Sequence, residues 1–239
     1  MTWFEPAAEH LGKAYLRYSF TKGTDQEVAF LLDALSLQPG QRLLDVGCGP
    51  GRHSHGFAQA GLEVVGVDLS QRFVDLATAE APPGATFLRG DARELAFDAE
   101  FDVAISLCQG GFGLVSGGPG TAVDGDGVVL ERMARAVKPG GLVAVSAFSA
   151  YFQLRWLEET DSFDADRGVN HEVMTVKDES GAERSIDAWT TCMTPRELRL
   201  LARQAGLEPL HVWSVGPGTY AKAPPTIESY EFLLVAARR

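Results

Sequence analysis

The chain has 239 residues, of which 45% are hydrophobic and 22% charged, and its formal net charge is −11. This length suits a single core, and the composition is that of a folded globular protein. The negative charge disfavours nucleic-acid partners and binding to an anionic membrane surface. No stretch has the length of a membrane helix, the N-terminus lacks an apolar signal core, and the three cysteines lack C-x-x-C spacing. We therefore expect one cytoplasmic domain over 1–239.

Helices and strands are predicted to alternate between residues 24 and 148. Apolar residues recur at helical spacing over 24–37, behind Thr24 as a cap with Glu27 three residues later. Short apolar runs predict strands at 42–46, 63–70, 85–91, 101–107 and 141–148. Helical patterns predict further helices at 53–60, 70–81, 126–138 and 194–206.

Parallel strands need right-handed crossovers, so this alternation predicts an α/β fold with a doubly wound, mostly parallel sheet. The alternation stops after residue 149, and we interpret 150–192 as an insertion rich in aromatic and acidic residues. Closing strands at 208–215 and 229–238 are predicted to pair as a hairpin. The expected sheet thus has seven strands, of which the last is antiparallel.

A glycine-rich turn in "LLDVGCGPGRHS" (43–54) follows the first strand. Such dense glycines indicate a tight turn or a ligand close to the backbone. A dinucleotide fingerprint needs a third glycine where Arg52 stands, and no Gly-Lys-Ser/Thr of a phosphate loop occurs. A calcium loop starting at Asp124 would place Arg135 where a Glu is needed, and the pair His53 and His55 lacks a third ligand. No metal site is predicted.

The order of strand, "DVGCGPG" turn, helix, strand ending in "GVD" and strand ending in "GDA" resembles the class I S-adenosylmethionine-dependent methyltransferases over about residues 40–148. The resemblance implies a Rossmann-like methyltransferase fold with S-adenosyl-L-methionine as cofactor. It implies that the glycine turn approaches the methionine part, that Asp68 binds the ribose hydroxyls, and that Asp91 lies by the adenine amino group. The cofactor-binding residues so implied are Asp45, Gly47, Cys48, Gly49, Gly51, Asp68, Leu69, Asp91, Ala92, Leu107 and Gln109.

The chemistry of these acids agrees with that interpretation. One carboxylate can accept two hydroxyl hydrogen bonds, as a ribose requires, and strand ends face the crevice where open α/β sheets bind ligands. Taken singly, each acid could equally be a helix cap or a solvated loop charge.

The acceptor half of the site is expected in the insertion 150–192 and in an N-terminal helical lid over 1–40, which contains Tyr15 and Tyr18. The same aromatic residues could instead cover an exposed sheet edge. The predicted acceptor-binding residues are Tyr151, Arg155, Trp156 and Trp189. His171 is the candidate general base, although Glu172 beside it would point to the opposite face of an extended segment.

Methyl transfer from a sulfonium can proceed through alignment and exclusion of water alone, so a catalytic motif is not required. The favoured function is methylation of a small molecule. The alternatives are a cofactor-binding regulatory or interaction protein without turnover, and a methyltransferase acting on RNA or a nucleotide. The sequence does not determine the acceptor atom or the oligomeric state.

Overall fold

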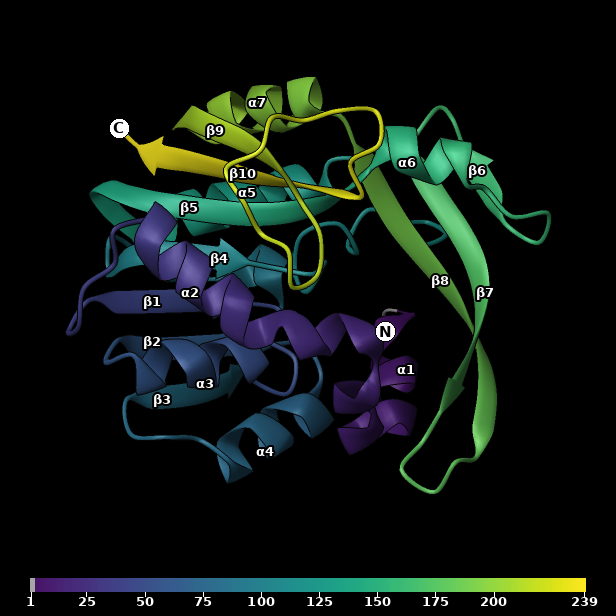
Figure 1. The fold of residues 1–239 in the computed structure, drawn as a ribbon, viewed down its shortest axis with the longest axis horizontal. Coiled ribbons are helices and arrows are strands. Elements are labelled where there is room, and N and C mark those ends of the chain that lie inside the picture. The colour runs from purple at the N-terminus through teal and green to yellow at the C-terminus, as the bar shows by residue number, and fades with distance from the viewer. Residues whose placement is uncertain (1–2) are drawn as a thin grey trace.

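A seven-stranded sheet forms the centre of residues 3–239, which are the residues that the computed structural model describes (Figure 1). Its order is β3-β2-β1-β4-β5-β10-β9, in which the first five strands are parallel and β10 is antiparallel to both of its neighbours. These strands are β1 (Arg42–Val46), β2 (Glu63–Asp68), β3 (Ala85–Arg89), β4 (Phe101–Ser106), β5 (Val137–Ser149), β9 (Leu207–Val215) and β10 (Glu231–Arg238). The predicted fold class and the closing hairpin are confirmed.

Both faces of the sheet are covered by helices, and two hydrophobic clusters fill the space between. Neighbouring residues of β1 point to opposite faces: Leu43 belongs to the cluster under α2 and α3, and Leu44 to the cluster under α5 and α7. This explains why the strand consists of consecutive apolar residues. The helices between and beside the strands are α2 (Thr24–Ala34), α3 (Arg52–Gln59), α4 (Gln71–Ala79), α5 (Gly125–Ala136) and α7 (Pro195–Gln204).

Local capping chemistry sets where several helices begin. Ser70 caps α4 by accepting the backbone N–H of Phe73, and Thr194 forms a capping box with Glu197 at α7. The predicted cap at Thr24 is wrong. Gly23 occupies the cap position, and the carboxylate of Glu27 is held by Arg52 and His53 instead of returning to the helix terminus.

The insertion after β5 adds three strands to the predicted seven. It begins with the short helix α6 (Ala150–Arg155) and continues as β6 (Ser162–Asp164), β7 (Val169–Lys177) and β8 (Glu183–Met193). β7 and β8 form a long antiparallel hairpin, and β8 joins β5 only through Phe148↔Cys192 and Ser149↔Met193. Figure 1 shows this hairpin extending away from the sheet and passing beside α1 (Phe4–Leu11).

The N-terminal segment lies between this hairpin and α4. It consists of α1 and the 3-10 helices η1 (Gly12–Arg17) and η2 (Ser19–Gly23). At the hairpin tip, Glu179 Oε1 accepts hydrogen bonds from the Lys13 backbone N–H at 2.9 Å and from Arg72 Nη2 of α4 at 3.0 Å. Three parts of the chain are therefore joined at one carboxylate. Among residues 3–239, no helix has the length and apolar character needed to cross a membrane.

Candidate active site

The glycine turn after β1 has left-handed backbone at Gly47, Gly49 and Gly51. A Cβ atom on Gly47 would lie 2.0 Å from the carbonyl carbon of Gly110, so the turn needs glycine where it touches the loop after β4. A Cβ on Gly49 would have only the rings of Phe73 and Tyr15 nearby, each at 4.0 Å. The backbone at Gly49 thus borders open space that a ligand can enter.

Asp68 lies at the carboxyl end of β2 and is buried beside this turn. Its Oδ2 accepts the backbone N–H of Gly49 at 2.8 Å, and its Oδ1 accepts the backbone N–H of Ser70 at 2.8 Å. Burial raises the pKa of Asp68 to about 6, although these two hydrogen bonds favour the ionised form. Each oxygen retains a lone pair, so the carboxylate can still accept hydroxyl groups.

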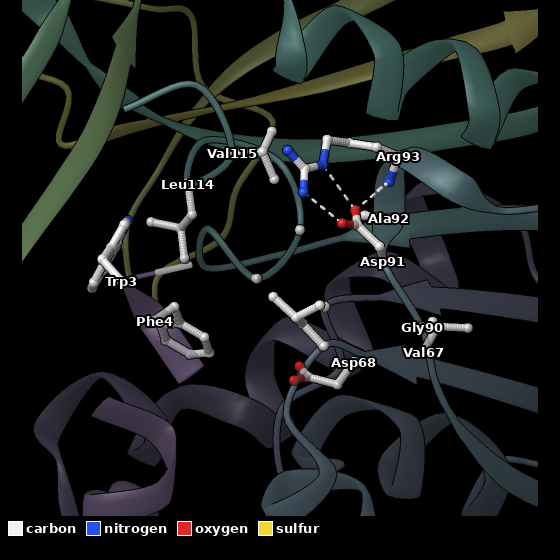
Figure 2. Close-up of a pocket in the computed structure, with 14 residues that line it drawn as sticks. Trp3, Phe4, Val67, Asp68, Gly90, Asp91, Ala92, Arg93, Leu114 and Val115 are labelled. Atoms are coloured by element: carbon white, nitrogen blue, oxygen red, sulfur yellow. Dashed lines mark hydrogen bonds and ion pairs between the residues drawn. The ribbon is translucent and has the colours of Figure 1, made fainter. Parts of the chain in front are cut away.

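A first pocket lies beyond Asp68, against the strand ends of β2 and β3. Figure 2 shows Asp68 and Asp91 on one side of this pocket and Trp3 and Phe4 across from them. Leu69 and Ala92, which are among the predicted cofactor-binding residues, also line it. Asp91 is bound by Arg93, whose Nε and backbone N–H both lie 2.9 Å from Oδ1. The Arg93 guanidinium holds the pKa of Asp91 below its usual range, and this partner was not predicted.

A second cavity of about 260 Å³ shares Gly47, Asp68 and Leu114 with the first pocket. We call it the acceptor cavity, after the role that is proposed for it below. The N-terminal segment contributes Tyr15 and Phe20, while the sheet edge contributes Phe148 and Glu231. Its lining residues from the β7–β8 hairpin are Glu172, Met174, Ala188 and Thr190.

The alternation of side chains along the two strands of the hairpin decides which of its residues line this cavity. Successive side chains of a strand point to opposite faces, and Glu172 is paired with Ala188 on the inner face. His171 and Trp189 are the neighbouring pair and stack on each other on the outer face, with ring centroids 4.7 Å apart. His171 Nε2 lies 2.8 Å from Asp187 Oδ1. This placement speaks against His171 as the base and Trp189 as an acceptor contact.

The other three predicted acceptor residues lie on α6 or at its end and line neither pocket. Tyr151 packs edge-on against Phe232, and Arg155 forms an ion pair with Glu228. Trp156 is 59% exposed. The helix follows β5 directly and turns these side chains away from the cavity, which the order of residues in the sequence could not reveal.

Four of the predicted cofactor residues line neither pocket. Asp45 is buried and accepts a 2.6 Å hydrogen bond from Ser54 Oγ; burial raises its pKa to about 6. Gly51 is the left-handed cap residue of α3. Cys48 and Leu107 are buried. Gln109, in contrast, lines the acceptor cavity directly, and its backbone is also left-handed, with φ 54°.

Glu231 is a site residue that the sequence analysis missed. Because β10 runs antiparallel to its neighbours, its first residue lies at the edge where the parallel strands end. Glu231 is only 4% exposed, and its Oε2 has no hydrogen-bond partner among residues 3–239. Burial, reinforced by the charge of Glu27, raises the pKa of Glu231 to about 7, against the opposing effects of Gln109, Arg52 and Ser146. The sequence did contain a signal for this residue, because Glu231 is an acid at the start of a last strand that was predicted to be antiparallel.

A buried polar network reaches the cavity at Cys108, which is one of its lining residues. Glu27 Oε2 lies 2.6 Å from His53 Nε2 and 2.8 Å from Arg52 Nη1, and Arg52 Nη2 lies 2.8 Å from Cys108 Sγ. His53 and Arg52 together lower the pKa of Glu27 to about 2, although burial alone would raise it. Glu27, His53 and Cys108 offer ligand atoms within 4.8 Å of one another, but the guanidinium that binds two of them would repel a cation.

Comparison with known proteins identifies the family. Residues 43–141 match a family described as a methyltransferase domain. The chain is 31% identical over 217 residues to the cypemycin N-terminal methyltransferase of a Streptomyces species, covering 84% of each protein. It is 39% identical over 120 residues to the demethylmenaquinone methyltransferase of Renibacterium salmoninarum, covering 50% of this chain and 46% of that one. The chain belongs to the class I S-adenosylmethionine-dependent methyltransferases.

Solved structures agree on the fold. The CcbJ methyltransferase from Streptomyces caelestis superposes with a TM-score of 0.72 at 22% identity, covering 90% of both chains. CalS10, an amino pentose methyltransferase from Micromonospora echinaspora solved with S-adenosylmethionine bound, gives 0.65 at 23% identity, covering 95% of this chain and 96% of that one. As a member of this family, the protein is a methyltransferase that uses S-adenosylmethionine, which supplies a methyl group on a positively charged sulfur when bound.

The described residues fit this cofactor. The open space at Gly49 admits a ligand against the backbone, and Asp68 and Asp91 are acceptors for hydroxyl and amino groups.

Replacing Asp68 by Asn tests the ribose role. We expect the affinity for S-adenosylhomocysteine, the demethylated cofactor, to fall about tenfold to a hundredfold, because a charge-assisted hydrogen bond contributes about 1.5–3 kcal/mol. Titration calorimetry measures the affinity and a thermal melt verifies the fold. Asp187→Asn, on the outer face of the hairpin, is the matched control. Unchanged affinity in a folded Asp68→Asn protein removes Asp68 from this role.

Proposed function

We propose that this methyltransferase acts on a small molecule bound in the acceptor cavity. The observation that carries the proposal is the cavity itself, which is largely apolar, has a few polar groups and is lined at one end by Gly47 and Gly49 of the glycine turn and by Asp68. Its volume of about 260 Å³ is near the lower end for small-molecule sites. The net charge of −11 disfavours a nucleic-acid acceptor.

The activities for which the relatives are named support small acceptors. They include a demethylmenaquinone methyltransferase, a ubiquinone biosynthesis O-methyltransferase and the amino pentose methyltransferase CalS10. These acceptors differ from one another, so the relatives support the class of substrate and not one molecule.

We further propose that the N-terminal segment within 1–40 acts as a lid and that the hairpin within 150–192 forms the acceptor wall. Tyr15 and Phe20 of the N-terminal segment line the cavity together with Met174 and Thr190 of the hairpin. Glu179 joins the hairpin tip to both the N-terminal segment and α4. With these elements held together, an acceptor in the cavity would be shielded from water.

The test is methyl transfer from isotopically labelled S-adenosylmethionine into a cell extract separated into small-molecule and macromolecular fractions. We expect label in the small-molecule fraction, and its loss with a Gly49→Val protein. Label confined to RNA supports the nucleic-acid alternative. Cofactor binding with no label in any fraction supports a regulatory protein without turnover, and either outcome contradicts the proposal.

A further inference from the structure

The charge lining the acceptor cavity is entirely negative. Three acids line the cavity: Glu172, Glu231 and Asp68, of which Asp68 also lines the first pocket. Within residues 3–239, no Lys, Arg or His side chain lines it. Two further acids in a largely apolar cavity are costly unless a ligand compensates them, because burial disfavours a charge without a partner.

The two acids come from different elements and have different surroundings. Glu231 opens β10, lies beside Phe148 of β5 in the register, and has an oxygen without a hydrogen-bond partner among the described residues. The Nε2 atom of Gln109 is likewise unpartnered in this part of the chain. Gln109 lies close enough to Glu231 to favour its carboxylate form, although Gln109 Nε2 and Glu231 Oε2 do not meet in a well-formed hydrogen bond. A donor and an acceptor that the described residues do not satisfy thus lie side by side in the cavity lining, which is the condition expected of a site awaiting a polar ligand.

Glu172 stands on the hairpin, half-buried, with Met174 two residues further along the same face. Burial raises its pKa, and the nearby negative charges of Asp161 and Glu158 act in the same direction. A cation in the cavity would relieve both effects. Tyr15, Phe20 and Phe148 add aromatic faces, which attract cations.

We propose that the methyl acceptor is an amine that enters as its ammonium ion, that Glu172 attracts the cation, and that Glu231 takes the proton from the nitrogen. This inference rests on the proposed function and specifies its substrate class. An anionic or phosphorylated acceptor would meet like charges on both walls and is disfavoured.

The proton and electron movements balance. A protonated amine has no lone pair and cannot attack the methyl group. The ammonium therefore first gives one proton to Glu231, which restores the lone pair on its nitrogen. The nitrogen then forms a bond to the methyl carbon as the carbon–sulfur bond breaks, and that electron pair stays on the sulfur. Glu231 returns its proton to solvent after the product leaves.

Several charged or titratable groups face Glu231 from the neighbouring elements. Glu27 of α2 favours its protonated form, whereas Arg52 of α3 favours the carboxylate. Cys108 and Tyr220 also lie within its electrostatic reach, and burial keeps both of them neutral by raising the pKa of each. Their balance leaves the pKa of Glu231 at about 7, which suits a group that accepts and returns a proton near neutral pH.

Binding of matched amines and alcohols tests the inference without turnover. The protein is loaded with S-adenosylhomocysteine and titrated with benzylamine and benzyl alcohol, and with phenethylamine and 2-phenylethanol. We expect each amine to bind at least tenfold more tightly than its alcohol. Glu172→Gln and Glu231→Gln should each reduce this preference, while Asp187→Asn, which removes one charge from the outer face of the same hairpin, should retain it. Equal binding, no amine binding, or a preference that survives both substitutions overturns the proposal.

The product identifies the acceptor atom independently. With S-adenosylmethionine carrying ¹³C in its methyl group, carbon NMR of the small-molecule product distinguishes N-, O-, S- and C-methyl groups. An N-methyl product is expected. A methyl on oxygen, sulfur or carbon overturns the amine inference but leaves the methyltransferase acting on a small molecule, so the two proposals fail separately.

Discussion

Turnover of the Glu231→Gln protein is expected to fall by about two to four orders of magnitude, with the affinity for S-adenosylhomocysteine unchanged. Gln has nearly the same shape as Glu but cannot take a proton, and Glu231 lines the cavity in which the acceptor is proposed to bind. His171→Ala is the control, because His171 faces the outer side of the hairpin. Initial rates with a saturating acceptor and calorimetry with S-adenosylhomocysteine measure the two quantities.

The pH dependence distinguishes a base from a residue that only shapes the cavity. The wild-type kcat/KM should rise as pH increases to about 7 and then level off, since the carboxylate is the active form. The free energy of unfolding, in contrast, should fall as the pH rises over the same range. A folded pKa raised from 4.5 to about 7 gives stability that is present below pH 4.5 and is lost, by roughly 3 kcal/mol, as pH rises through 7.

Glu231→Gln should lack this loss, so its melting temperature relative to wild type should be higher at pH 8 than at pH 5. Asp45 and Asp68 also have raised pKa values, but both proteins contain them and their effects cancel in the comparison. A Glu231→Gln protein that keeps wild-type turnover and the same pH profile would falsify the assignment.

Gly49→Val is expected to lower the cofactor affinity by more than a hundredfold while the sheet stays folded. The new side chain would extend into the open space beside the turn, whose nearest atoms are 4.0 Å from the Cβ position. The left-handed backbone adds a cost of about 1–2 kcal/mol, which a folded domain can tolerate. Calorimetry with S-adenosylhomocysteine and a thermal melt are the measurements.

Gly47→Ala provides the contrast. Its Cβ would lie 2.0 Å from a backbone carbon of Gly110, which cannot move aside as a flexible side chain can, so we expect both stability and binding to fall. If Gly49→Val also loses its cooperative melting transition, Gly49 serves the turn alone and the space beside it is not required for the cofactor.

The sheet and the cofactor half of the site could be predicted because their signals are local. The run 42–46 forms β1 with the predicted bounds, the glycine turn comes directly after that strand, and Asp68 is the last residue of β2. At such positions the chain order itself brings the residues to the carboxyl edge of a parallel sheet. Asp91 and Ala92 were located by the same rule and line the first pocket.

The residues proposed to contact the acceptor could not be predicted, because their positions depend on the register of the hairpin strands and on the pairing of strands that are far apart in the sequence. Composition identified the insertion, but only the pairing of β7 with β8 determines that Glu172 faces inward and His171 outward. Glu231 is separated from Gln109 by more than half of the chain and joins it only because β10 is antiparallel. Glu27 was assigned to a helix terminus because its buried partners, Arg52 and His53, lie on another helix.

The weak attachment of the hairpin has an evolutionary consequence. β8 is joined to the seven-stranded sheet through two residue pairs only, whereas β5 and β10 share seven. Substitutions along the inner face of the hairpin should therefore change the lining of the cavity with little effect on the sheet that positions Gly49 and Asp68. With the hairpin as the proposed acceptor wall, a lineage could exchange one methyl acceptor for another by altering alternate residues of a single hairpin, without rebuilding the part of the protein proposed to hold the methyl donor.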